Sequence, residues 1–409
     1  MATILAGVSW SDFDNIYVVA AIWIGLALVA SLISIRIGLA VALTEILVGV
    51  VAGNLFHLRP TDWINFLASF GSVLLTFLAG SEIDPPTFRR FLKPSLAIGG
   101  IGFALPFAAA WAFAWYALQW NWQASQVAGI ALSTTSVAVV YAVMIETGLN
   151  KTDIGKLILT ACFVCDLGTV GALGVLFANY NVLLVLFAVA TVIVLVFFTR
   201  VLKSVARVFG HAVSEPEVKF VFLLLFLLGG LAAAAKSEAV LPAYLLGLVA
   251  AGAFHEDPRL MGRIRGTAFS FLTPFFFLKA GTLIVLKSVI AGIVGVLLLF
   301  AIKMVAKVIG VYPMTLAFKV KGRQALYTTM MMSTGLTFGS ISALFGLTHG
   351  YIDQAQYSIL VTVVIMTALV PTLIAQGLFY PKTHHLRWGS ENPPAELERQ
   401  AERELAGEH

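Results

Sequence analysis

Charged residues are scarce in this 409-residue chain, and their scarcity indicates which solvent surrounds the folded chain. Asp, Glu, Lys and Arg make up 11% of the residues, and hydrophobic residues make up 59%. Soluble globular domains carry about 25% charged residues. So few charges cannot cover the surface of a chain this long in water, which excludes a soluble cytosolic enzyme. Disorder is excluded as well, because disordered segments have low hydrophobicity. Most of the chain is therefore expected to lie in a lipid bilayer.

Motifs of enzymes and of nucleotide-driven pumps are also missing. The sequence contains no Gly-rich phosphate-binding loop, no H-E-x-x-H pair and no nucleophile elbow. We therefore expect no enzymatic activity, no cofactor and no ATP-driven transport by this polypeptide. The net charge of +5 is not gathered into a patch, so nucleic acid is not expected as a partner.

Cysteine and intramembrane histidine are rare. Cys162 and Cys165 form a single C-x-x-C in an apolar stretch, without the second pair that tetrahedral zinc would need. Thiolates do not form readily in such surroundings, so both cysteines are expected to be small packing residues. No histidine lies clearly inside an apolar stretch, which argues against a histidine proton relay.

Long apolar stretches are abundant, and a spanning helix needs about 20 such residues. Thirteen stretches qualify, and they cover residues 17–35, 37–57, 62–80, 94–118, 123–147, 152–177, 182–202, 217–236, 238–254, 268–286, 288–310, 324–346 and 355–378. The sequence predicts an all-α polytopic membrane protein with about 13 transmembrane helices. It divides into an N-terminal extracytoplasmic segment (1–16), a membrane domain (17–380) and a cytoplasmic tail (381–409).

The basic residues predict the orientation of these helices. With thirteen spans, 20 of the 26 Lys and Arg residues fall on one side of the membrane, and only Arg59, Lys236 and Lys287 fall on the other. Because basic loops stay in the cytoplasm, the N-terminus is expected outside and the C-terminus in the cytoplasm of a cell (inner) membrane.

Two stretches are interrupted by small polar residues at matching places. The fifth contains Ser133-Thr134-Thr135-Ser136, and the twelfth contains Ser333-Thr334-Gly335-Leu336-Thr337. If the seventh stretch joins two inverted six-helix repeats, each interruption lies in the fifth helix of its repeat, a common plan in secondary transporters. The pattern predicts discontinuous helices that cross near the bilayer midplane. The alternative is that these hydroxyl groups only pack helices together.

Asp166 lies near the centre of the sixth stretch, where a charge costs at least about 3 kcal/mol. Its retention indicates an ion or proton site; the alternative is a carboxylate that is salt-bridged or hydrogen-bonded only for folding. A carboxylate placed there can hold a cation or a proton but not both, and that competition couples the transport of the cation to the transport of the proton. The expected ion- and proton-binding residues are Asp166, Thr134, Thr135, Ser136, Cys165, Ser333 and Thr334, with Asp166 as the ligand of Na+ or K+.

Four further charges inside apolar stretches are candidates for a role within the membrane. Lys303 and Lys307 lie four residues apart on one helix face and are expected to compensate charge or to couple to protons. Lys307 lies near the predicted cytoplasmic end, so extension of its ammonium to the headgroups is the alternative. Glu45, beside a Gly49 and Gly53 packing face, and Lys279 are candidate structural residues.

Taken together, these residues resemble the cation:proton antiporter superfamily, in the branch of NapA-type sodium/proton exchangers and Kef-type potassium-efflux membrane domains. The likeness runs over about residues 17–378. The four stretches that carry it are Leu43-Thr-Glu45-Ile-Leu-Val-Gly49, Phe77-Leu-Ala-Gly80-Ser-Glu82-Ile-Asp84, Ala131-Leu-Ser-Thr134-Thr135-Ser136, and Asp166 with its flanks. The segment Lys307-Val-Ile-Gly310 resembles the lysine helix of NapA-type proteins and adds to the likeness.

The resemblance implies a core and a dimerisation subdomain interleaved in sequence, elevator-type alternating access, and a homodimer. It assigns the ion-binding carboxylate to Asp166 and the crossing hydroxyls to Thr134, Thr135 and their neighbours. The sequence departs from the family at Cys165, where electrogenic members carry a first acid, and at Leu336, where related exchangers carry an acid.

With a single intramembrane aspartate, the predicted function is secondary active, electroneutral exchange of a monovalent cation, Na+ or K+, for a proton. A sodium-coupled symporter of an organic solute is one alternative, and a channel or sensor that kept the transporter fold is another. The choice between Na+ and K+ and the existence of a separate cytosolic regulatory subunit stay open.

Overall fold

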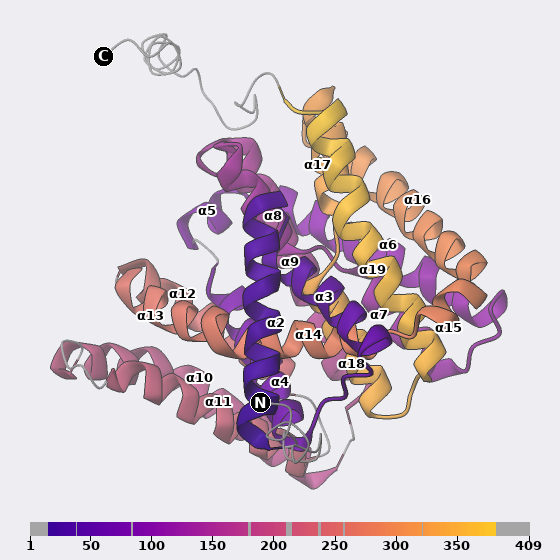
Figure 1. The fold of residues 1–409 in the computed structure, drawn as a ribbon. Helices are drawn as coiled ribbons and strands as arrows, with labels where there is room; N and C mark the ends of the chain where they lie inside the picture. The colour runs from indigo at the N-terminus through magenta and orange to yellow at the C-terminus, as the bar shows by residue number, and fades with distance from the viewer. Residues whose placement is uncertain are drawn as a thin grey trace, which may run out of the picture.

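The computed structural model describes most of the membrane domain. The described residues are 15–37, 39–82, 85–178, 181–209, 215–235, 239–256, 258–320 and 322–381. Within these ranges the chain forms helices and no strands, as the composition predicts (Figure 1). Nearly all of the predicted tail (381–409) and of the N-terminal segment (1–16) lies outside the described residues.

The first half of the chain contains both long helices and short ones. Its elements are α2 (Ile16–Ile37), α3 (Val41–Leu55), α4 (Asp62–Ser81), α5 (Pro85–Arg90), α6 (Leu92–Tyr116), α7 (Trp122–Ser133), α8 (Val137–Glu146), the 3₁₀ turn η2 (Leu149–Lys151), α9 (Asp153–Leu176) and α10 (Val182–Phe209).

The second half continues in the same way. Its elements are α11 (Pro216–Ala234), α12 (Val240–Glu256), α13 (Pro258–Thr267), the π-helical turn η3 (Ala268–Leu272), α14 (Thr273–Thr282), α15 (Leu286–Ala291), α16 (Ile293–Ala317), α17 (Arg323–Met332), α18 (Thr337–Thr348) and α19 (Gln354–Leu378).

Every predicted stretch coincides with a helix or with a pair of consecutive helices. Among the described residues, nine helices are long and apolar enough to cross a membrane, with α17 and α18 taken together as one. The remaining stretches form shorter or interrupted helices, among them α3 and α12. The count of thirteen spans therefore stays a prediction, whereas the all-helical membrane architecture is confirmed.

Large apolar side chains cover the outside of several helices. On α10 they include Val185, Val189, Val192 and Val196, each at least half exposed. Exposed apolar faces of this extent suit hydrocarbon rather than water as the surrounding solvent.

The helices pack into two groups. The scaffold bundle comprises α2, α3, α4 and α10 to α14, in which α4 packs on α12 and α3 packs on α14. The crossing bundle comprises α6 to α9 and α16 to α19, in which α6 contacts α7, α9 and α16. In Figure 1, α10 to α13 lie at the lower left and α16, α17 and α19 at the upper right. Packing within each bundle is much denser than packing between them.

Glycines hold the scaffold bundle together by letting helix backbones meet. A Cβ atom on Gly49 of α3 would lie 2.3 Å from the carbonyl oxygen of Leu278, and one on Gly281 of α14 would lie 2.1 Å from that of Ile46. A Cβ on Gly53 would lie 2.4 Å from the carbonyl oxygen of Thr282. The packing role expected for Gly49 and Gly53 is confirmed.

One helix end was predicted wrongly. The expected eleventh span ends at 310, but α16 runs to Ala317 and includes Pro313. A proline inside a membrane helix is tolerated because its neighbours can satisfy the freed backbone group. Lys307 consequently lies well inside the helix and is fully buried, so its ammonium does not extend to the headgroups.

Candidate ion-binding site

The two predicted interruptions meet in space. Helix α7 ends at Ser133 and α8 begins at Val137, while α17 ends at Met332 and α18 begins at Thr337. The backbone N–H of Ser136 donates to the carbonyl oxygen of Thr334 at 3.2 Å, which joins one interruption directly to the other. Four half-helix ends therefore converge, as the matched polar runs predict.

The hydroxyl groups at this crossing are buried and mostly bonded to backbone. Side-chain oxygens donate from Thr134 to Ala131 (3.2 Å), from Thr135 to Met332 (2.9 Å), from Ser333 to Thr329 (2.7 Å) and from Thr334 to Met331 (2.8 Å). The Ser136 hydroxyl accepts a hydrogen bond from the Val139 N–H at 3.4 Å. These residues stabilise the interrupted geometry, because carbonyl groups at helix ends otherwise lack partners.

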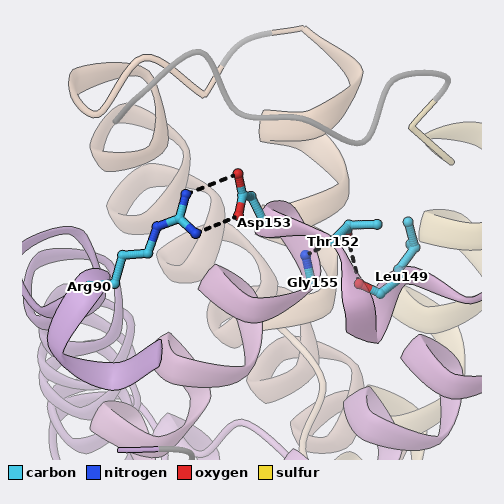
Figure 2. A network of polar contacts seen from close by, with 5 residues as sticks. All are labelled: Arg90, Leu149, Thr152, Asp153 and Gly155. Atoms are coloured by element: carbon cyan, nitrogen blue, oxygen red, sulfur yellow. Dashed lines mark hydrogen bonds and ion pairs between the residues drawn. The ribbon is translucent and has the colours of Figure 1, made fainter. Parts of the chain in front are cut away.

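The helix that carries Asp166 is fixed at its first turn (Figure 2). Thr152 caps α9 by accepting from the Gly155 N–H at 3.2 Å and donates to the Leu149 carbonyl at 2.7 Å. Asp153 pairs with Arg90 at 3.4 Å and places a negative charge at the positive end of the helix. The pair is partly exposed and contributes at most about 1 kcal/mol, so its main effect is to position α9.

Asp166 is 1% exposed, and among the described residues neither of its carboxylate oxygens has a hydrogen-bond partner. It lines a cavity of about 50 Å³ between the two bundles. Leu75 and Leu78 of α4 and Phe277 of α14 line the scaffold side, and Val137 and Thr337 line the crossing side. An unpaired buried carboxylate is costly unless a proton or a cation occupies the site.

Thr337 is a site residue that the sequence analysis does not single out. It begins α18, lines the same cavity as Asp166, and has a hydroxyl oxygen that finds no hydrogen-bond partner within the described part of the chain. It belongs to the polar run that marks the second interruption. The sequence alone does not tell which hydroxyls of that run the backbone uses and which one stays free.

The two lysines of α16 reach one interruption each. The Lys307 Nζ donates to the Thr135 hydroxyl at 2.9 Å and lies 3.7 Å from the Cys165 Sγ. The Lys303 Nζ donates to the Thr367 hydroxyl at 3.1 Å, and that hydroxyl lies 3.4 Å from the Gly335 carbonyl oxygen. Both lysines are fully buried, and no carboxylate of the described residues forms an ion pair with either.

Glu45 and Lys279 are buried in the scaffold bundle rather than at the crossing. Glu45 of α3 is 2% exposed and lies on the helix face that Gly49 packs against α14. Lys279 of α14 is 6% exposed. Neither lines the cavity of Asp166, although Ala42, one turn before Glu45, does.

A second cavity lies next to the cavity of Asp166. This cavity has a volume of about 260 Å³ and is lined by Tyr141, Asn150 and Lys156, among others. It shares Glu82 and Val137 with the cavity of Asp166. The approach therefore lies on the side where α9 begins, which the basic-residue bias predicts to be cytoplasmic.

Glu82, just beyond the end of α4, stands at the junction of these two cavities. The Arg265 guanidinium of α13 donates to its carboxylate at 2.6 Å. Burial raises the pKa of the Glu82 carboxyl, and the nearby Arg265 charge opposes that rise. Arg265 thereby fixes the position of the Glu82 carboxyl group on the approach to Asp166.

A larger cavity of about 1310 Å³ opens on the opposite side. It is lined by Phe70 of α4, Gln126 of α7, Phe226 of α11 and His349 after α18, and it does not include Asp166. In this structure the carboxylate is thus closer to the Glu82 side.

Known proteins resemble this chain over nearly its whole length. A probable Na(+)/H(+) antiporter 3 of Methanocaldococcus jannaschii is 23% identical over 358 residues, which are 83% of this chain and 91% of that protein. The Na(+)/H(+) antiporter NhaS4 of Synechocystis is 23% identical over 401 residues, which are 88% and 96% of the two chains. A Na(+)/H(+) antiporter of Enterococcus hirae is 23% identical over 365 residues, covering 85% and 93%.

The fold has a counterpart among solved structures. The sodium proton antiporter MjNhaP1 of Methanocaldococcus jannaschii matches with a TM-score of 0.66 at 14% identity, over 87% of this chain and 95% of that one. The family model for the transmembrane sodium/hydrogen exchanger matches residues 24–379. The chain therefore belongs to the transmembrane sodium/hydrogen exchanger family.

Proposed function

We propose that this protein is a secondary active antiporter that exchanges Na+ for protons across a membrane, with Asp166 binding the two ions alternately. The observation that carries the proposal is the carboxylate of Asp166, which is buried between the bundles without a hydrogen-bond partner. A group in that state gains from binding either a proton or a cation, and it cannot hold both. The names of the full-length relatives, all sodium/proton antiporters, support Na+ as the cation.

The position of the cavity supports an elevator-type motion. Residues of both bundles line the cavity, and packing between the bundles is sparse. Sliding the crossing bundle along the scaffold bundle would carry Asp166 from the Glu82 side toward the larger cavity. The site is also too small for an organic solute, because about 50 Å³ is far less than the roughly 300 Å³ or more of an ordinary small-molecule pocket.

The residues around Lys307 support electroneutral exchange. Where a second acid would pair with the lysine, the chain has Cys165, and the ammonium donates instead to the Thr135 hydroxyl. With Asp166 as the single exchanging carboxylate, one proton would move for each monovalent cation. An imposed membrane voltage would then drive no net transport in proteoliposomes, and voltage-driven proton flux would contradict this stoichiometry.

The function itself is tested by reconstituting the purified protein in proteoliposomes with an internal pH-sensitive dye. Adding Na+ should drive a proton flux that saturates with the Na+ concentration and is inhibited competitively by protons. Asp166→Asn should abolish that flux. Asp62→Asn, at the exposed first turn of α4 and away from the Asp166 cavity, is the control and should keep exchange. Full exchange by Asp166→Asn would refute the assignment. Running the assay with Na+, Li+ and K+ determines the cation.

A further inference from the structure

Thr337 combines three properties that set it apart from the other hydroxyls near the crossing. Its side chain is 7% exposed, its hydroxyl oxygen has no hydrogen-bond partner, and it lines the cavity that contains Asp166. The hydroxyls of Thr134, Thr135, Ser333 and Thr334 instead donate to backbone carbonyls. Buried polar groups are usually satisfied, so a free hydroxyl in the same cavity as an unpaired carboxylate is a candidate partner for whatever the carboxylate binds.

The size of the cavity limits how a cation can sit there. A cavity of about 50 Å³ is far smaller than an ordinary small-molecule pocket of roughly 300 Å³ or more, so a bound cation gives up waters to contacts with protein groups. A hard cation must then replace lost water oxygens with oxygens of the protein. The side-chain oxygens around the cavity belong to Asp166, Thr337 and Glu82, and Glu82 is held by Arg265.

We propose that the Thr337 hydroxyl is a direct ligand of the transported cation, supplying a neutral oxygen beside the Asp166 carboxylate. This inference rests on the proposed exchange at Asp166 and adds the second protein ligand. A hydroxyl oxygen coordinates a cation through its lone pairs, whereas the exchanged proton binds to the carboxylate. Thr337 therefore affects the affinity for the cation more than the affinity for the proton, and it links α18 to the site.

The helix offers a matched comparison one turn further on. Ser340 of α18 is also fully buried and its hydroxyl also lacks a partner, but it does not line the cavity of Asp166. Both hydroxyls thus lack a hydrogen-bond partner, but of the two residues only Thr337 lines the cavity of Asp166. A substitution at Ser340 reports what loss of a buried hydroxyl in α18 does on its own.

The test measures Na+ and proton dependence of exchange in proteoliposomes for Thr337→Val, Thr337→Ser and Ser340→Ala. Thr337→Val should raise the apparent KM for Na+ by about tenfold, as loss of a contact to a charged group predicts, with the proton dependence at saturating Na+ nearly unchanged. Thr337→Ser and Ser340→Ala should stay within about twofold of the unmodified protein in apparent KM. If Thr337→Val does not fold, Thr337→Ala carries the same comparison.

A second readout separates binding from transport. Na+ should raise the thermal unfolding temperature of the purified protein, and Thr337→Val should shift that dependence to higher Na+ concentration. If the unmodified protein exchanges Na+ and Thr337→Val keeps its KM, the ligand role of Thr337 is refuted while the proposed function stands. If the unmodified protein exchanges no monovalent cation, the proposed function fails first.

Discussion

Lys307 of α16 donates a hydrogen bond to the Thr135 hydroxyl at 2.9 Å, and no carboxylate of the described residues forms an ion pair with it. The Cys165 Sγ lies 3.7 Å from the same ammonium, at the position where the resemblance places an acid. Thr135 in turn donates to the Met332 carbonyl of the other interruption. Lys307 thus connects α9, the first interruption and, through Thr135, the second one.

Restoring an acid beside Lys307 should change the stoichiometry of exchange. In Cys165→Asp the new carboxylate would lie within reach of the Lys307 ammonium, because the sulfur it replaces is 3.7 Å away. A second titratable carboxylate beside Asp166 allows a second proton per cycle. We expect imposed voltage to alter the exchange rate of Cys165→Asp in proteoliposomes but not that of the unmodified protein.

Cys165→Ser is the control for this change, since it keeps a small neutral group at the position. It should remain insensitive to voltage. The same voltage response in both variants would show that loss of the thiol, and not gain of a charge, alters the cycle.

The sequence predicts the parts of the site that depend on local chemistry. Small polar runs inside apolar stretches predict the two interruptions, because such side chains compete for backbone groups in lipid. The acid near the centre of the sixth stretch likewise predicts a buried carboxylate, and Asp166 is 1% exposed.

The rest depends on contacts between distant segments. Glu82 and Arg265 are 183 residues apart in sequence and meet through the packing of α4 on α12, the helix that precedes α13. Whether the Thr337 hydroxyl has a hydrogen-bond partner depends on how the backbone groups of α17 and α18 are paired in the folded structure. The end of α16 was misplaced because Gly310 and Pro313 are ordinary helix-ending signals in water, whereas this helix continues through them.

A side chain at Gly335 should displace Lys303 without unfolding the protein. A Cβ atom there would lie 2.3 Å from the Lys303 Nζ and 3.0 Å from the Thr134 hydroxyl oxygen. The ammonium is the end of a flexible chain and can move, but it would lose its bond to Thr367 and leave the second interruption. We expect Gly335→Ala to lower turnover at least about tenfold in the proton-flux assay, as loss of a buried charged contact predicts.

Gly171→Ala, on α9, has open space around the added methyl group and is the control for Gly335→Ala. Its turnover should match that of the unmodified protein. Normal turnover in Gly335→Ala would show that the position of Lys303 has little influence on exchange.

Gly247 should be intolerant of any side chain, because it faces backbone. A Cβ atom on this residue of α12 would lie 2.0 Å from the Phe77 carbonyl oxygen of α4. Helix backbones cannot move as a side chain can, so Gly247→Ala should destabilise the scaffold bundle by about 2 kcal/mol. Thermal unfolding of the purified protein should show a clearly lower midpoint than for Gly252→Ala on the same helix, where nothing lies within 4 Å of the added atom. Equal midpoints would mean that the bundle adapts to the extra atom.

Tyr244 should favour the conformation described here, because it bonds across the boundary between the bundles. Its hydroxyl, on α12, donates to the Phe163 carbonyl of α9 at 3.0 Å, one turn before Asp166, and its ring packs edge-on against Phe338 of α18. A motion of one bundle along the other must break that hydrogen bond. Removing a bond worth about 1 kcal/mol in Tyr244→Phe should shift the population of the two conformations by about fivefold.

The shift can be followed at Asn150, which lines the cavity on the Glu82 side. An Asn150→Cys variant reports the openness of that cavity through its rate of maleimide labelling, since both native cysteines are buried. Adding Tyr244→Phe should slow the labelling, because less of the protein would have the cavity open. Tyr380→Phe removes a hydroxyl bond to the Thr147 carbonyl within the crossing bundle, and it should leave the labelling rate unchanged. A hydrogen bond within one bundle, such as that of Tyr380, cannot bias the relative position of the two bundles. Equal slowing by both tyrosine variants would therefore mean that the hydroxyl of Tyr244 stabilises the fold in general.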